Sequence, residues 1–360
     1  MKQMTHQEFQ RLLWESAFRT ATPLSNMFEL TPLCNLDCRM CYVHLQDPSV
    51  RERMLKGEQW ISIFDEAIRC GMISAILTGG EAMTHPDFWK LYDYLFDQGI
   101  SLSVKTNGIL LTKEAVDRFV QYPPSTIDVS IYGCDRTSYQ TITGHDCFEL
   151  VDRNLHYAKE CGLPIRLMIT PTGLLEPWID SVLAYAKSFD GKTIVNTQLL
   201  DPQPDTGRDR RDYDLSPETI LDIRRRANAL FQSDQLSYEE EGNGDSASDW
   251  KAAKEGLRCA AGRSQFAVTW DGMMVPCITF PRELIACSVL EHGVKGAWEK
   301  IHEAVVNYVV PEKCNTCAFQ EQCNYCPSSH GQYAIRNACN PSVCAFQQGL
   351  IVEYQNQKRK

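Results

Sequence analysis

Two segments of the chain repeat apolar residues with the period of an α-helix, Glu58–Cys70 and Asp87–Gln98. In each segment the apolar residues recur three and four positions apart, so that they form one stripe along the helix. A glycine follows each stripe, Gly71 after the first and Gly99 after the second, where a helix commonly ends. The pattern therefore predicts two amphipathic helices, each buried along one face.

Short runs rich in β-branched and other apolar residues lie around these helices. Six of them are predicted to be strands: Met27–Leu30, Ile73–Leu77, Leu102–Val104, Ile127–Ile131, Ile165–Ile169 and Ile194–Leu199. Alternating strands and helices pair in parallel through right-handed crossovers, which gives an open doubly wound sheet or a barrel-like one. In both architectures functional residues gather at the carboxyl ends of the strands.

Polar and reactive residues follow four of these predicted strands. Cysteines follow the first strand, Gly79-Gly80-Glu81 the second and Thr106-Asn107-Gly108 the third, while Ser130 ends the fourth. Because parallel strands end at one rim, these groups are predicted to share one site. Further acids, amides and hydroxyls on this rim, none with an assigned role, are Asp128, Tyr132, Asn196 and Gln198.

Composition narrows the classes of protein that this chain can be. No apolar run approaches the roughly 20 residues that cross a bilayer, and the first 20 residues have no apolar signal segment. We therefore expect no membrane insertion and a cytoplasmic location. The formal net charge of −10 argues against broad binding of nucleic acid, which requires Lys and Arg at the phosphates.

The chain contains 16 cysteines, which in a long sequence without an export signal indicate metal binding rather than disulfides. Three lie in the segment Cys34–Cys41, and nine lie between Cys259 and the C-terminus. The remaining four, in strand and helix contexts, are predicted to be core thiols: Cys70, Cys134, Cys147 and Cys161.

The thiols of Cys34, Cys38 and Cys41 are close enough in sequence for one loop to wrap around a polynuclear cluster. Three thiolates on a four-iron cubane leave one iron open to a small chelating ligand, such as the amine and carboxylate of an amino acid. The alternative is a closed zinc site in which His44 supplies a fourth ligand. That alternative leaves the other groups of the rim unexplained.

The spacing Cys34-x3-Cys38-x2-Cys41 after the first strand of an α/β repeat resembles the signature of the radical S-adenosylmethionine (SAM) superfamily. The resemblance implies a partial six-stranded (β/α)6 barrel, a [4Fe–4S] cluster on these cysteines, and reductive cleavage of SAM to a 5′-deoxyadenosyl radical. It also implies that Gly79, Gly80 and Glu81 hold the methionine amino group of SAM, with Ser130, Thr106 and Asn107 beside the same pocket. A capping serine and a turn asparagine are the structural alternatives for these last residues. Met40 stands where the family usually has an aromatic residue.

The cysteines from Cys259 onward resemble the loop-rich auxiliary-cluster extension called SPASM, whose members mostly modify peptides or proteins. The resemblance rests on Gly272-x4-Cys277 and on Cys314-x2-Cys317-x5-Cys323-x2-Cys326, although the family usually has three residues in the last gap. It implies one or two auxiliary [4Fe–4S] clusters. One would be held by Cys314, Cys317, Cys323 and Cys344, with Cys339 competing for the last position; the other would be held by Cys259, Cys277 and Cys326, completed by Cys287 or an exogenous group. The alternative is a zinc-ribbon-like module, because paired Cys-x2-Cys knuckles also suit tetrahedral zinc.

Four domains follow: an N-terminal segment (1–24), the radical SAM barrel (25–215), a connector (216–258) and the SPASM region (259–360). The charged stretch Asp201–Leu257 is predicted to be a helix plus a solvated connector. It includes arginines and an acidic segment that we expect to be exposed: Arg208, Arg210, Arg211, Arg224–Arg226 and Glu239–Asp249.

The leading functional hypothesis is a maturase that oxidatively crosslinks a ribosomally made peptide through a thioether or a carbon–carbon bond. Only 33 residues precede Cys34, so a separate protein is expected to bind a leader peptide, unless the barrel and extension recognise the substrate alone. An electron donor such as flavodoxin or ferredoxin is also implied. Three alternatives are formylglycine formation as in sulfatase maturases, tetrapyrrole-type modification of a small molecule, and a non-catalytic iron–sulfur or zinc scaffold. Ile278 disfavours the first, because sulfatase maturases commonly have Asp at this position.

Overall fold

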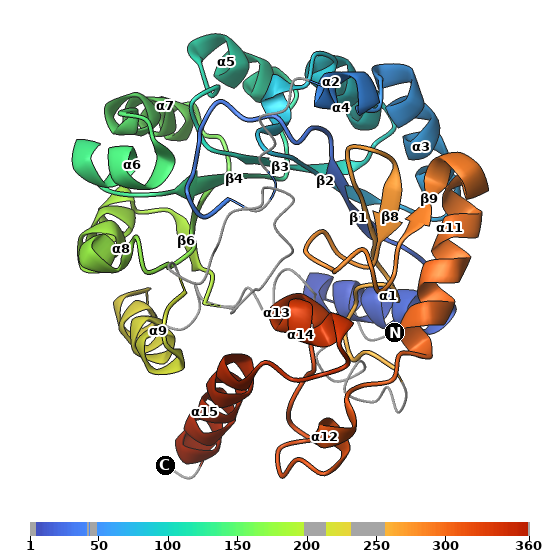
Figure 1. Ribbon diagram of the computed structural model, residues 1–360. Helices are drawn as coiled ribbons and strands as arrows, with labels where there is room; N and C mark the ends of the chain where they lie inside the picture. The colour runs from blue at the N-terminus through green and yellow to red at the C-terminus, as the bar shows by residue number, and fades with distance from the viewer. Residues whose placement is uncertain (1–4, 42, 44–48, 198–213, 232–255, 359–360) are drawn as a thin grey trace.

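The computed structural model describes residues 5–41, 43, 49–197, 214–231 and 256–358. Within these ranges nine strands form one sheet, in the order β6-β5-β4-β3-β2-β1-β7-β8-β9. Their bounds are β1 (Ser25–Glu29), β2 (Ser74–Thr78), β3 (Ser101–Thr106), β4 (Thr126–Ile131), β5 (Ile165–Ile169), β6 (Lys192–Val195), β7 (Ala267–Val268), β8 (Met273–Val275) and β9 (Cys287–Ser288). Figure 1 shows the sheet curving into a partial barrel with helices on its outer side.

The first six strands are parallel, and helices connect each to the next. The connecting elements are α2 (Val50–Arg53), α3 (Gly57–Arg69), the 3-10 helix η1 (Ala82–Thr84), α4 (Phe88–Asp97), α5 (Lys113–Gln121), α6 (Arg136–Thr143), α7 (Phe148–Glu160), the 3-10 helix η2 (Glu176–Trp178) and α8 (Ile179–Phe189). The predicted six-stranded α/β partial barrel is confirmed. Helices α3 and α4 differ from the two predicted helices by one residue at each end.

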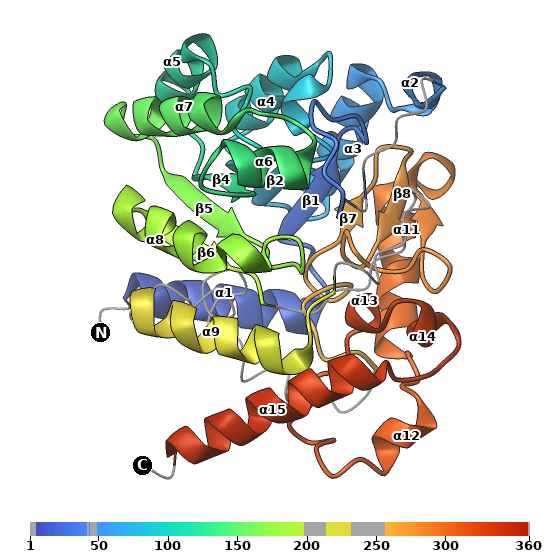
Figure 2. The ribbon, with the colours of Figure 1, turned by 60° about the vertical axis from the view of Figure 1, so that its left-hand side comes forward.

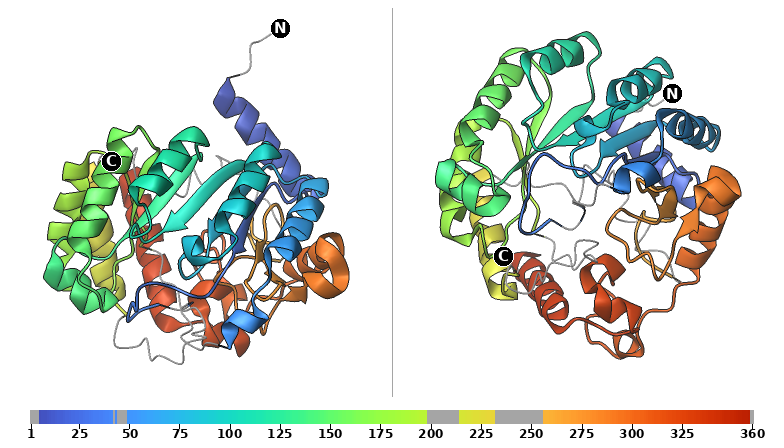
Figure 3. Two further views of the ribbon diagram at one scale, coloured as in Figure 1. Left: turned by 90° about the horizontal axis from the view of Figure 1, so that it is seen from above. Right: turned by 45° about the horizontal axis from the view of Figure 1, so that its top comes forward.

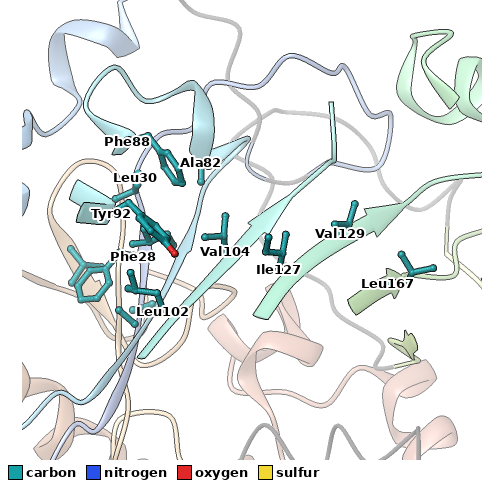
Figure 4. Packing of buried hydrophobic residues seen from close by; sticks show 14 of the residues in the cluster. Phe28, Leu30, Ala82, Phe88, Tyr92, Leu102, Val104, Ile127, Val129 and Leu167 are labelled. Carbon is teal, nitrogen blue, oxygen red and sulfur yellow. The ribbon is translucent and has the colours of Figure 1, made fainter. Parts of the chain in front are cut away.

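The hydrophobic core lies between the strands and the outer helices. Phe28, Val104 and Leu167 are 0% exposed on three different strands, and Figure 4 shows them in one continuous layer with residues of η1 and α4. Because side chains alternate between the faces of a strand, the intervening residues face the inside of the barrel. That inner face carries charged and polar groups, among them Lys105 and Asp128.

The C-terminal region continues the same sheet. Strand β7 pairs in parallel with β1, and β7, β8 and β9 follow one another in antiparallel order. The Asn26 side chain secures the join, because its Oδ1 accepts from the Phe266 N–H at 3.0 Å and its Nδ2 donates to the Pro23 carbonyl at 2.9 Å. The three added strands were not predicted, since runs of two or three residues carry no readable alternation.

We expect Asn26→Ala to weaken this join. Asn26 is 1% exposed, so the substitution leaves a donor and an acceptor without partners in a buried position. At about 1–3 kcal/mol for each such group, the free energy of unfolding should fall by about 2–6 kcal/mol. Chemical denaturation measures the loss. In the exposed control Asn307→Ala, water replaces the bond that Asn307 Nδ2 donates to the Glu303 carbonyl, and an equal loss there would contradict the argument.

The remaining helices close the ring between the two ends of the partial barrel. These are α9 (Pro217–Phe231), α11 (Val289–Val306), α12 (Glu312–Asn315), α13 (Pro327–His330), α14 (Gln332–Ile335) and α15 (Pro341–Lys358). Helix α15 packs on α9, where Arg225 Nε lies 3.4 Å from Glu353 Oε1. Figures 2 and 3 show the C-terminal elements filling the side of the ring between β1 and α9.

Helix α9 lies in the predicted connector, as expected for its helical part. Arg208, Arg210, Arg211 and the acidic segment Glu239–Asp249 fall outside the described residues, and the four predicted domain boundaries remain predictions. The N-terminal segment forms α1 (His6–Thr20), which a capping box between Thr5 and Glu8 begins. In the part of the chain that the structure describes, no helix combines the length and apolar character that a bilayer span needs.

Candidate functional site

The loop that follows β1 carries Cys34, Cys38 and Cys41 and lies against the loop that follows β2. Gly80 N donates to the Thr31 carbonyl at 2.7 Å, and Glu81 N donates to the Leu33 carbonyl at 2.9 Å. A Cβ atom on Gly79 would lie 2.4 Å from the Thr31 carbonyl oxygen, and one on Gly80 would lie 2.5 Å from that of Leu33. The two glycines therefore let the two loops approach closely.

The three thiols of this loop lie within electrostatic reach of one another. Burial raises the pKa of Cys34 to about 12 and the pKa of Cys38 well above its usual value. A buried thiolate therefore needs compensating positive charge, which iron supplies. The thiols of this loop, which need positive charge when they ionise, therefore fit the [4Fe–4S] cluster that their spacing predicts.

Hydrogen-bond donors also point at these sulfurs. Leu36 N lies 3.4 Å and Asn107 Nδ2 3.7 Å from Cys34 Sγ, and the Tyr132 hydroxyl donates to Cys38. Tyr132 also hydrogen-bonds to Ser130, so the predicted rim residues of β4 reach the cysteine loop. Such donors stabilise thiolates that ligate a metal. Tyr132 was predicted to lie on the rim, without a role.

Glu81 is 1% exposed and anchors the rim. Its Oε2 accepts from Asn107 N at 2.7 Å and from Thr106 Oγ1 at 3.0 Å, while its Oε1 accepts from Met83 N at 3.2 Å. Burial raises the pKa of Glu81 to about 7, and these hydrogen bonds counteract part of that rise. The carboxylate therefore holds the end of β3 against the start of η1, and it brings Asn107 to the cysteine loop.

Asp128 lies on the inner face of the barrel as the centre of an ion-pair cluster. Lys105 Nζ lies 2.9 Å from its Oδ2, and Arg166 donates to both carboxylate oxygens, at 2.6 and 2.9 Å. Burial alone would raise the pKa of Asp128, but these two cations hold it below its usual value. The Asp128 carboxylate is therefore held in ion pairs with Lys105 and Arg166 and is not available as a general base. Lys105 and Arg166 were missed, although the register of β3, β4 and β5 aligns them with Asp128.

Asp128→Asn should therefore destabilise the fold. Asp128 is 2% exposed, and the substitution leaves two partly buried cations without their counter-charge. Breaking a buried pair typically costs about 3–5 kcal/mol, and we expect a loss toward the lower end because Lys105 keeps some contact with water. Urea unfolding measures the loss, and Asp117→Asn, which breaks an exposed pair with Lys113, should cost less than about 1 kcal/mol. Equal losses in both variants would contradict this account.

The structure divides most C-terminal cysteines into two groups. The first contains Cys259, Cys277 and Cys326, whose thiols lie within electrostatic reach of one another. The second contains Cys314, Cys317, Cys323, Cys339 and Cys344, with Cys314 Sγ 3.3 Å from Cys339 Sγ. Cys287 lies apart on β9, where it lines a cavity of about 480 Å³ against α11.

All sixteen cysteines are free thiols. The four predicted core thiols pack against the edge of the hydrophobic core: Cys70, Cys134, Cys147 and Cys161. Among the described residues, no three His, Cys, Asp or Glu side chains converge as a single ion requires. His44 and Gln198 lie outside the described residues.

The chain is similar to several known proteins. Residues 28–183 match the model of the Radical SAM superfamily. The chain is 26% identical over 337 residues to the AdoMet-dependent heme synthase of Methanosarcina barkeri, covering 85% of this chain and 92% of that protein. It is 29% identical over 182 residues to the mycofactocin maturase MftC of Mycobacterium tuberculosis, covering 49% of this chain and 45% of MftC.

The whole fold is similar to a solved structure of a peptide-bound protein. The crystal structure of Streptococcus suis SuiB bound to precursor peptide SuiA has a TM-score of 0.68 to this chain. The two are 15% identical, and the match covers 93% of this chain and 79% of SuiB. At this identity the likeness shows a shared fold.

Proposed function

Because the chain belongs to the radical SAM superfamily, and is therefore an enzyme with a [4Fe–4S] cluster and SAM as cofactors, we propose that it oxidatively modifies a ribosomally made peptide. The modification would be a thioether or carbon–carbon crosslink. The observation that carries this proposal is the gathering of eight C-terminal cysteines into two groups beside the barrel. The match to MftC and the fold shared with peptide-bound SuiB support it.

We assign the [4Fe–4S] cluster of the initiating chemistry to Cys34, Cys38 and Cys41. When bound and reduced, that cluster supplies the electron that splits SAM to a 5′-deoxyadenosyl radical. Gly79 and Gly80 would present backbone to the methionine end of SAM, and Ser130, Thr106 and Asn107 would line the same pocket. In this arrangement Glu81 acts by holding Thr106 and Asn107 in place, since its carboxylate accepts from both residues.

The two C-terminal groups would hold auxiliary [4Fe–4S] clusters, on Cys259, Cys277 and Cys326 and on Cys314, Cys317 and Cys323 with Cys339 or Cys344. Oxidative crosslinking needs an electron acceptor. Abstraction of one hydrogen atom from the peptide, followed by loss of one electron and one proton, removes two hydrogens in total and forms the new bond. An auxiliary cluster held by these cysteines would supply the acceptor for that electron. Cys287 as a ligand, the separate leader-binding protein, flavodoxin or ferredoxin and the cytoplasmic location stay predictions.

The test is co-expression with a precursor peptide encoded beside the gene, followed by mass spectrometry of that peptide. We expect a product lighter by two hydrogens with the wild-type chain. We expect none with a variant in which Cys34, Cys38 and Cys41 are replaced by alanine. An unchanged peptide, despite full iron loading and formation of 5′-deoxyadenosine, would reject peptide crosslinking. A modified Ser or Cys carrying an aldehyde would instead indicate formylglycine formation.

A second candidate is modification of a small tetrapyrrole, favoured by the match over 85% of this chain to the heme synthase. Incubation of the reduced enzyme with SAM and an iron tetrapyrrole distinguishes the two. A changed tetrapyrrole mass together with an unchanged peptide would select this function. The scaffold alternative is set aside because the superfamily is one of enzymes.

A further inference from the structure

The sulfur of Cys277 lies among hydroxyl groups. Ser328 Oγ is 3.3 Å and Thr279 Oγ1 is 3.6 Å from Cys277 Sγ. Two hydroxyl groups therefore lie at one thiol of the group Cys259, Cys277 and Cys326.

Two short turns position these hydroxyls. On the strand side, Phe280 N donates to the Cys277 carbonyl at 3.0 Å, which folds Thr279 back toward the cysteine. On the helix side, Ser329 N and His330 N donate to the Cys326 carbonyl at 3.0 and 3.1 Å and fix the single turn of α13. That turn carries Ser328, which is 1% exposed. The same turn thus presents one thiol of the group and the hydroxyl that reaches another.

The direction of the hydrogen bonds follows from the chemistry of a bound thiolate. In the free thiol either partner can donate, but a metal-bound Cys277 has no proton and can only accept. The hydroxyls of Ser328 and Thr279 must then both donate to the sulfur. A donor at a cluster sulfur stabilises the reduced, more negative state more than the oxidised state, and so raises the reduction potential.

We propose that Ser328 and Thr279 are positioning residues that raise the reduction potential of the auxiliary cluster held by Cys259, Cys277 and Cys326, and so fit it to accept the electron that leaves the oxidised substrate. The proposal rests on the auxiliary cluster assigned under the proposed function. It extends that function by naming the cluster that accepts the electron and the side chains that raise the reduction potential of that cluster. In the second group, Cys314 Sγ lies 3.3 Å from Cys339 Sγ, and the cations within electrostatic reach of its thiols are Lys313 and Arg258.

The test is an anaerobic redox titration followed by electron paramagnetic resonance. The full-length chain would carry Cys34→Ala, Cys38→Ala and Cys41→Ala, so that only the two auxiliary clusters contribute signals. In this background we compare Ser328→Ala and Thr279→Val with Thr279→Ser, which keeps the hydroxyl and removes only a methyl group. We expect one of the two midpoint potentials to become more negative in Ser328→Ala and in Thr279→Val, and neither to change in Thr279→Ser.

The second midpoint and the iron content serve as internal controls. Unchanged potentials in Ser328→Ala and Thr279→Val would overturn the proposal. A loss of about 4 iron atoms in Ser328→Ala would also overturn it, because Ser328 would then be a ligand rather than a donor. Movement of both midpoints together would show a general structural effect and would count equally against it. Since no peptide is present, a failure of peptide modification leaves this result unaffected.

Discussion

Replacement of Cys34, Cys38 and Cys41 by alanine is expected to abolish 5′-deoxyadenosine formation and every substrate modification that depends on it. These thiols lie within electrostatic reach of one another on a single loop, and burial makes the thiolates of Cys34 and Cys38 costly without iron. With three [4Fe–4S] clusters in the wild type, iron per chain after reconstitution should fall from about 12 to about 8. Iron and sulfide assays and chromatography of the SAM products measure the two effects.

The matched control for this variant is Cys70→Ala, Cys134→Ala and Cys161→Ala. These cysteines are partly buried beside the core and belong to neither C-terminal group. The control should keep its iron and its 5′-deoxyadenosine, with only a modest loss of stability. If the Cys34 variant retained all of its iron, or if the control lost as much, the assignment of the initiating cluster would be wrong.

Glu81→Ala is expected to be the most damaging single substitution at the rim. Three donors lose their acceptor at once: the Asn107 N–H, the Thr106 hydroxyl and the Met83 N–H. At about 1–3 kcal/mol for each unsatisfied buried group, the free energy of unfolding should fall by about 3–9 kcal/mol. That is a large share of the roughly 5–15 kcal/mol that stabilises a typical protein. Denaturant unfolding monitored by circular dichroism measures it.

The control is Glu58→Ala, since Glu58 forms an ion pair with Lys90 at the surface and its side chain is 79% exposed. It should lose less than about 1 kcal/mol. We also expect Glu81→Ala to release Asn107, whose Nδ2 donates to Asn35 Oδ1 at 2.6 Å, and so to weaken SAM binding beyond the effect on stability. A Glu81→Ala chain as stable as the Glu58→Ala control would contradict the anchoring role.

The strands of the barrel and helices α3 and α4 were predictable because each is long enough to show its period. Helix α3 buries Trp60 and Phe64 on the stripe that the sequence displays, and Ile127, Val129 and Ile131 alternate along β4. Helix α1 was not predicted, although Thr5 and Glu8 have the spacing of a capping box.

The candidate site was predictable in its cysteines but not in the groups around them. Spacing alone brings Cys34, Cys38 and Cys41 together, because eight residues of one loop contain all three. By contrast, Cys277 and Ser328 are 51 residues apart, and only the tertiary fold places the hydroxyl at the sulfur. The burial of Glu81 likewise depends on packing that no local pattern reports.

The pairing of β7 with β1 has a consequence for how the chain is made. The bond between Asn26 and Phe266 joins residues 240 positions apart. Strand β1 therefore emerges from the ribosome long before β7, the second strand with which it pairs, has been synthesised. At about 5–20 residues per second, this strand waits roughly 10–50 s with one edge open. An open edge is a template for pairing with other chains. We therefore expect nascent or truncated chains that end before β7 to aggregate, and to depend on chaperones more than the finished protein does.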